Sequence, residues 1–212
     1  ALVTRFPLPA SEALEAQLKL ADLAGADNDW QTRKVWLEAI VKTDRDMGAE
    51  RSDRSRFLAA SSAIELARPM RDAFNAVVLT APLDKSLKLK KTRMEQALQA
   101  YGQAADYGVA QVTTAATFET ADLYYQLSRD LLASERPKDL DADESEQYDV
   151  LLEEQAFPFE EKAIDLYRVN AERAGDGVYD EWVRASYARL AVMVPARWSR
   201  TERSEDVITT ID

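Results

Sequence analysis

Residues 97–108 read ALQAYGQAADYG and place Ala97, Tyr101 and Ala104 on one stripe of a helix that ends before Gly108. Residues separated by three, four or seven positions share a face of an α-helix. Small residues on that face let a second helix approach closely, and the tyrosine between them fills the remaining space. The stretch therefore predicts a helix that packs tightly against its neighbour.

Glycine separates the amphipathic runs on either side of this stretch. Only Gly102 lies inside a run, whereas the other five glycines fall between runs: Gly25, Gly48, Gly108, Gly175 and Gly177. Glycine accepts the left-handed conformation that commonly ends a helix. We therefore expect each of the five to mark a helix end.

The apolar spacing predicts seven long helices and no strand, because it repeats at three and four and never at two. The helices are expected over about 11–25, 28–47, 50–78, 83–107, 109–133, 141–174 and 179–194. Asp27 or Asn28 is expected to cap the second helix and Asp141 or Asp143 the sixth. Pro69 and Pro158 fall inside runs, where proline kinks or breaks a helix.

These runs predict an all-α fold, an antiparallel helix-pair solenoid in one domain over residues 1–200. Residues 201–212 lack periodicity and are expected to form a flexible tail. The chain begins with Ala1 instead of Met, so a signal or anchor could have been removed.

Composition excludes several functions. The 212 residues contain no histidine and no cysteine, which removes thiolate chemistry and the common metal and Ser-His-Asp sites, and no metal or cofactor is expected. The formal net charge of −11 argues against nucleic acid and against an anionic membrane surface. No apolar run is long enough to cross a bilayer.

Three short patterns resemble the tetratricopeptide repeat, a pair of helices over 34 residues. The stretch Ala97-x3-Tyr101-x2-Ala104 is similar to the second helix of such a repeat. Ala163-x3-Tyr167 is a looser copy, and Trp182-x2-Ala185-Ser186 resembles the opening of a following first helix. The Leu-Gly pair of the full pattern is missing, so an ordinary helical bundle remains the alternative.

A longer resemblance covers residues 83–198. It rests on ADYGVAQVTTAATFETADLY (105–124), LLEEQAFPFEEKAIDLY (151–167) and DGVYDEWV (176–183). These strings are similar to bacterial repeat proteins associated with TonB–ExbB–ExbD-type energy-transduction and gliding-motility systems. The resemblance implies an envelope scaffold, periplasmic or lipid-anchored, that recruits other proteins.

Two charged segments have opposite sign. Residues 139–161 hold ten acidic residues and no Lys or Arg. This strip is either a solvated helix face or a docking surface for a basic partner, with Glu153, Glu154, Glu160 and Glu161 as contact residues. A basic cluster formed by Lys85, Lys88, Lys90, Lys91 and Arg93 could pair with the strip inside the fold.

Tyr124 is the aromatic residue that we expect in a concave peptide-binding groove, because Tyr125 shares the apolar stripe of its helix. The favoured function is a non-enzymatic scaffold that binds a protein or peptide. A small-ligand carrier or an enzyme using carboxylates and tyrosines in a groove is the alternative. A purely structural oligomerisation module is a third hypothesis.

Overall fold

The computed structural model describes residues 9–199, and these residues form helices and connecting turns without a strand. The long helices are α2 (Ala10–Ala26), α3 (Trp30–Asp46), α4 (Asp53–Asn75), α5 (Leu83–Ala105), α6 (Ala110–Leu132), α7 (Ala142–Glu172) and α8 (Glu181–Met193), and α9 (Pro195–Trp198) is short. The all-helical prediction is confirmed, and α2 to α8 correspond to the seven expected helices. The proposed tail at 201–212 lies outside the described residues.

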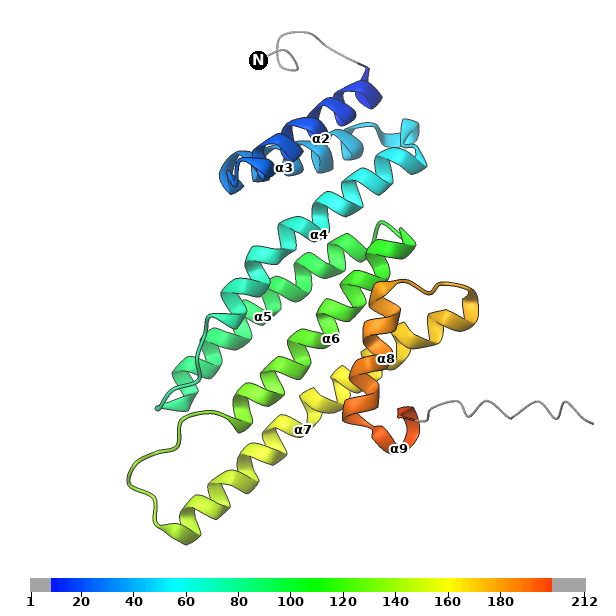
Figure 1. Cartoon of the computed structure of the whole chain (residues 1–212). Helices are drawn as coiled ribbons and strands as arrows, with labels where there is room; N and C mark the ends of the chain where they lie inside the picture. Colours follow the sequence, from blue (N-terminus) through cyan, green and yellow to red (C-terminus); the bar gives the residue numbers. More distant parts are fainter. Residues whose placement is uncertain (1–8, 200–212) are drawn as a thin grey trace, which may run out of the picture.

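Each long helix packs against the next one in the chain, and alternate helices also touch. Within residues 9–199, α2 contacts α4, α4 contacts α6, and α6 contacts α8. Figure 1 shows α4, α5, α6 and α7 side by side, with α2 and α3 at one end of the molecule. The helices α2, α4, α6 and α8 therefore form a continuous row of contacts along the molecule.

Side-chain caps begin several helices. Asp141 caps α7 and forms a reciprocal capping box with Glu144. Of the two expected caps, Asp141 and Asp143, the first is therefore the one observed. At α3 the cap is Asp29, which accepts from Thr32 N at 3.0 Å, so the expected cap at residues 27–28 is wrong. Helix α4 begins later than expected, with Ser52 as its cap, because residues 48–50 form a separate 3-10 turn.

Three of the five glycines expected at helix ends have the left-handed backbone: φ is 53° at Gly48, 68° at Gly108 and 82° at Gly177. Gly25 instead lies inside α2, and Asn28 takes the positive φ that follows this helix. A Cβ at Gly25 would collide with the Arg33 side chain, which donates to Ala21 O at 3.0 Å. Gly25 therefore provides room for Arg33. Gly175 lies in the 3-10 turn Arg173–Asp176.

Neither internal proline breaks its helix. Helix α4 runs through Pro69 and α7 through Pro158, and both prolines are exposed. Proline removes one backbone donor and leaves the carbonyl four residues earlier without its helical partner. On an exposed face, water can satisfy that carbonyl. Of the two alternatives expected at Pro158, a kinked helix or two short ones, the second is therefore wrong.

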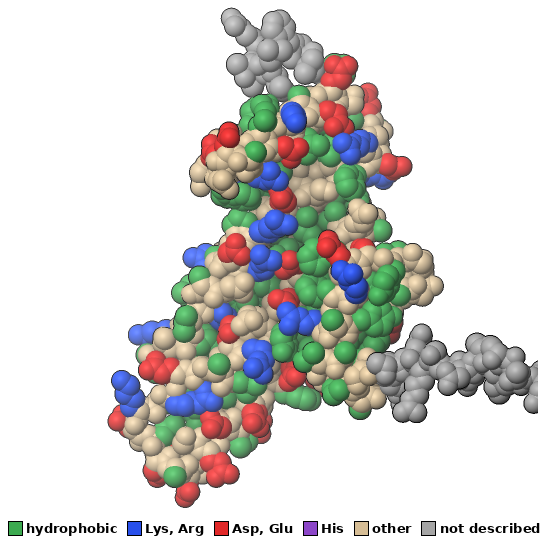
Figure 2. All heavy atoms as spheres, in the orientation of Figure 1, with side chains coloured by type: hydrophobic (Ala, Val, Ile, Leu, Met, Phe, Trp, Pro, Cys, Tyr) green, Lys and Arg blue, Asp and Glu red, His purple; other side chains and the backbone are tan. Residues whose placement is uncertain are grey.

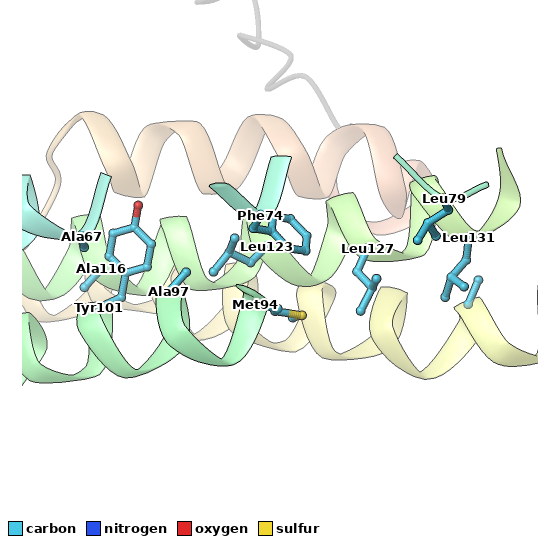
Figure 3. Packing of buried hydrophobic residues seen from close by; sticks show 11 residues of the cluster. Ala67, Phe74, Leu79, Met94, Ala97, Tyr101, Ala116, Leu123, Leu127 and Leu131 are labelled. Atoms are coloured by element: carbon cyan, nitrogen blue, oxygen red, sulfur yellow. The ribbon is translucent and has the colours of Figure 1, made fainter. Parts of the chain in front are cut away.

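The core consists of several clusters of buried side chains, each shared by neighbouring helices. Its main cluster draws buried side chains from α4, α5, α6 and α7, among them Phe74, Met94, Ala97, Tyr101 and Leu127 (Figure 3). A second cluster around Tyr167 and Leu190 joins α6, α7 and α8, and a third around Leu14 and Ile40 joins α2, α3 and α4. This core fixes the positions of the surface features described next.

Candidate functional site

A pocket of about 420 Å³ lies where α4, α6 and the start of α8 meet. Its apolar wall includes Phe57 and Ile64 of α4 and Trp182 of α8. Pockets that bind small molecules or single side chains usually have volumes of about 300–1,000 Å³. The volume is therefore sufficient for one ligand group.

Tyr101, from α5, reaches this pocket from the core. The residue is 1% exposed, and its buried hydroxyl lies beside the carboxylate of Glu119. In Figure 3 the hydroxyl points away from the ribbon of α5. Burial and the nearby Glu119 charge raise the pKa of Tyr101, so the hydroxyl stays protonated.

Glu119 of α6 also lines the pocket, and an ion pair holds it in place. Arg71 of α4 donates from Nη1 to both carboxylate oxygens of Glu119, at 2.8 and 3.0 Å. The Glu119 side chain is mostly buried, so screening by water is weak there. Glu119 is therefore a fixed negative group beside Tyr101.

A second tyrosine, on α7, also lies beside a carboxylate of α6 that is paired with an arginine. Tyr167 of α7 donates to Asp122 Oδ1 at 3.0 Å, and Arg189 of α8 donates to the same oxygen at 2.7 Å. Burial and the charge of Asp122 raise the pKa of Tyr167. Tyr101 and Tyr167 therefore each place a buried hydroxyl beside a carboxylate of α6.

Asp180 closes the side of the pocket at α8. Its Oδ1 accepts from the backbone N–H groups of Trp182 and Val183 at 3.0 and 2.9 Å, and its Oδ2 accepts from the Thr114 hydroxyl. These bonds use the donors at the N-terminus of α8. The following residue, Glu181, is exposed at the rim of the pocket.

A different surface feature lies on the outer side of α7. Phe157 is 57% exposed, and acidic residues stand three and four positions before and after it: Glu153, Glu154, Glu160 and Glu161. Residues at these separations are neighbours on a helix surface. Acidic side chains also gather at the lower end of the molecule in Figure 2, where α7 begins. The four predicted contact residues thus surround an exposed aromatic ring.

The predicted repeat residues lie mostly in the helix contacts. Ala97, Ala104 and Ala163 are fully buried. Ser186 is also buried and accepts from Asn170 Nδ2 at 3.0 Å. Trp182 is half-buried, with its ring centroid 5.4 Å from that of Phe118.

Tyr124, predicted for the groove, lies between α6 and α7. Its ring stacks on Phe159 with centroids 6.5 Å apart, and it packs against both neighbouring core clusters. Tyr125 is half-buried, and the Arg189 guanidinium lies 5.3 Å from its ring centroid. Tyr124 is therefore part of the packing between helices, whereas Phe157 among the four glutamates is exposed.

Lys90 has a role that the sequence does not make obvious. In the sequence, Lys90 belongs to the basic cluster of α5. In the structure its side chain is buried, and only 1% of the residue is exposed. Its Nζ donates to Phe74 O and Val77 O at 3.1 and 2.8 Å and lies 2.6 Å from Asp130 Oδ2. Its ionic partner is thus on α6 and not in the acidic strip.

A signal for this role is present in the sequence. Lys90 occupies the one polar position of an otherwise apolar stripe, and Arg71 does the same on α4. Both side chains form ion pairs with α6 in the structure. A single charge in an apolar stripe therefore indicates a contact between helices.

Among the described residues, no group of three or more acidic residues is placed to hold a metal ion, and no helix is both long and apolar enough to cross a membrane. Comparison with family models, with curated proteins and with solved structures finds no match for this chain.

Proposed function

We propose that this protein is a non-enzymatic scaffold that recruits a protein partner through the outer face of α7. The observation that carries the proposal is the exposed ring of Phe157 with glutamates at three and four positions on both sides. Binding hot spots combine a buried aromatic anchor with a surrounding polar rim. Phe157 would be the anchor and the four glutamates the rim.

The partner expected at this surface is basic and offers an apolar cavity for one ring. Burial of a phenylalanine side chain contributes about 1.5–3 kcal/mol. The glutamates add little affinity while they stay hydrated, but they attract a positive surface and orient it. Val150 is also exposed, one heptad before Phe157, and extends the apolar line along α7.

The proposed architecture is a tetratricopeptide-like solenoid. Its support is the packing of consecutive helices in pairs, the contacts between alternate helices, and the burial of Ala97, Tyr101, Ala163 and Tyr167 in the second helices of two pairs. Helical repeats of this kind present extended surfaces for protein binding. The envelope location is part of the proposal and is supported by the sequence resemblance alone.

A small-ligand carrier is the second candidate function, and the pocket beside Tyr101 favours it. Tyr101 and the Glu119 carboxylate line the pocket, and a tyrosine with a carboxylate is the combination that a carrier of this kind would use. The lack of histidine and cysteine in the chain supports a binding role over an enzymatic one.

Affinity capture from native membranes with three forms of the protein tests the scaffold. The forms are the wild type, Phe157→Ala, and Val192→Ala, which removes an exposed apolar side chain of α8. We expect mass spectrometry to identify a protein that the wild type and Val192→Ala retain, and that Phe157→Ala loses about tenfold or more. Identical sets of retained proteins from all three forms would contradict the proposal.

A further inference from the structure

The first half of α7 turns only a narrow row of side chains toward the rest of the protein. Between residues 142 and 161, Leu152 and Ala156 are buried, whereas three large apolar side chains on the other side are about half exposed: Val150, Leu151 and Phe157. The cluster that α7 shares with α8 lies further along, at residues 163–171. In Figure 1 the first half of α7 lies at the edge of the molecule, away from α8. These apolar side chains are therefore accessible to a partner.

The exposed side of this half repeats every seven residues. Val150 and Phe157 are seven positions apart, and the polar side chains on either side of them follow the same spacing. One polar row is formed by Glu146, Glu153 and Glu160, and the other by Gln147, Glu154 and Glu161. Two helices that wind around each other have 3.5 residues per turn, so an apolar row with a period of seven stays in contact with the second helix. The spacing thus fits a helix that lies along α7.

A hollow of about 560 Å³ lies on this side of α7. Its lining comes from six residues of the one helix: Asp143, Glu146, Gln147, Val150, Leu151 and Glu154. When two helices pack side by side, a side chain of one enters a hole formed by four residues of the other. Four neighbours on a helix surface stand at positions i, i+3, i+4 and i+7. The lining residues form two such sets in succession, 143/146/147/150 and 147/150/151/154, so the hollow has the form of two holes for side chains of a second helix.

The charge of this surface selects a basic helix. Residues 139–161 contain no Lys or Arg, so both polar rows are without a positive side chain. In paired helices, the charged residues beside the apolar row determine which helix binds. A second copy of this half of α7 would place glutamate against glutamate, which opposes binding.

We propose that the partner, whose recruitment through α7 is the proposed function on which this step rests, contributes an α-helix that lies along residues 143–161. Apolar side chains of that helix, three and four positions apart, enter the two holes and contact Phe157. Lys or Arg residues on both sides of its apolar row face the two polar rows of α7.

Titration of the full chain with synthetic peptides tests the class of partner. The probe is a peptide of about three heptads with leucine at the a and d positions and lysine at the e and g positions, where lysines oppose pairing of the peptide with itself. The control peptide has the same composition in an order that spreads the leucines around the helix. We expect the probe to shift the backbone amide signals of residues 143–161 and to bind about tenfold more tightly than the control. Equal affinities, or shifts only elsewhere, would overturn the proposal.

Two matched substitutions separate the apolar contact from the charge. Val150→Asp changes a residue of both holes, and Val169→Asp changes a valine of similar exposure in the second half of α7. Both add one negative charge, which by itself favours a basic peptide. We expect Val150→Asp to weaken binding of the probe about tenfold and Val169→Asp to bind as the wild type does. Unchanged or tighter binding in Val150→Asp would overturn the proposal, because charge alone would then explain the affinity.

Affinity capture with Val150→Asp and Phe157→Ala distinguishes this proposal from the scaffold function. Loss of the same protein with both variants supports the two together. Loss with Phe157→Ala alone keeps the scaffold function and overturns the helix along the two holes, whereas retention by Phe157→Ala contradicts the scaffold function itself. Sedimentation velocity of the full chain tests the other occupant. A dimer that Val150→Asp dissociates would assign this face to a second copy and overturn the basic helix.

Discussion

The buried ammonium group of Lys90 connects three helices. It extends from α5, donates to carbonyl oxygens at the end of α4, and pairs with Asp130 of α6. It also lies 4.3 Å from the centroid of the Phe74 ring. Phe74 O also accepts from the backbone N–H of Val77 at 3.1 Å, so the contribution of Lys90 lies mainly in the bond to Val77 O and the ion pair with Asp130.

Replacement of Lys90 by methionine should lower the free energy of unfolding by about 3 kcal/mol, because it removes the donor to Val77 O and the ionic partner of Asp130. Urea denaturation measures this change. Lys88→Met is the matched control, since Lys88 is exposed on the same helix and its loss should cost less than about 0.5 kcal/mol. Equal midpoints for the two variants would show that the Lys90 contacts do not stabilise the fold.

The buried tyrosines predict loss of stability at high pH. Tyr101 and Tyr167 have pKa values raised by burial and by neighbouring carboxylates, whereas the ordinary tyrosine value is 10.0. Below that pH the folded and unfolded states are both protonated, so these groups cause no pH dependence. Above it the unfolded state releases protons first, and stability falls as pH rises.

The double variant Tyr101→Phe/Tyr167→Phe should lack this dependence. Each tyrosine contributes a slope of up to about 1.4 kcal/mol per pH unit once the unfolded state is ionised. Urea denaturation between about pH 9 and pH 11 should therefore give a shallower fall in the free energy of unfolding for the variant than for the wild type. Parallel curves would contradict the role assigned to the two hydroxyl groups.

At the scale of the helix, alanine substitutions at Gly102 and Gly108 should change the free energy of unfolding in opposite directions. Gly102 lies inside α5, where an added Cβ would meet no neighbouring side chain within 4 Å, while Gly108 has a φ of 68°. Gly102→Ala should raise the free energy of unfolding by about 0.5–1 kcal/mol, since alanine is the better helix former. Gly108→Ala should lower it by about 1 kcal/mol, because alanine is strained at positive φ. Thermal denaturation that gave the same sign for both would contradict these helix bounds.

The contact between α5 and its neighbours depends on small side chains. Ala97 is fully buried in the main core cluster, so Ala97→Leu should overpack this contact and destabilise the fold by about 1–3 kcal/mol. Gln99→Leu adds a leucine on an exposed position of the same helix and should change the stability little. An unchanged melting temperature for Ala97→Leu would place the close helix contact elsewhere.

The sequence is sufficient to predict the helical elements but not all of their ends. Periodic apolar spacing is a local property, and the seven long helices follow from it. The start of α4 is expected too early because residues 48–50 form a 3-10 turn, which has no distinctive apolar pattern. Pro158 is expected either to kink α7 or to divide it, and the sequence alone does not show that the residue is exposed and the helix unbroken.

The candidate sites can be predicted only in part, because exposure and packing between helices are not visible in the sequence. Glu153, Glu154, Glu160 and Glu161 follow from the acidic run, but the importance of Phe157 depends on its exposure. The pocket joins residues of α4, α5, α6 and α8 that are far apart in the chain. Its assembly depends on tertiary packing, which the spacing of residues along a single helix does not encode.

At the scale of the whole molecule, the pocket beside Tyr101 and the outer face of α7 are separate features. The row formed by α2, α4, α6 and α8 contains the pocket beside Tyr101, and α7 presents the proposed docking surface. The net charge of −11 repels acidic proteins and increases the encounter rate with basic ones. The local charge around Phe157 should then determine where a basic partner binds.

The central claim is that the face around Phe157 recruits the partner. The most direct test measures the association rate of the captured partner with a variant that changes Glu153, Glu154, Glu160 and Glu161 to lysine. A control variant changes the exposed residues Glu12, Asp22, Asp27 and Glu50 to lysine, which alters the net charge equally. At low salt we expect the α7 variant to associate about tenfold more slowly than the control. The difference should shrink as salt screens the charges. Equal rates for the α7 variant and the wild type would contradict the claim and leave this strip as a solvated helix face.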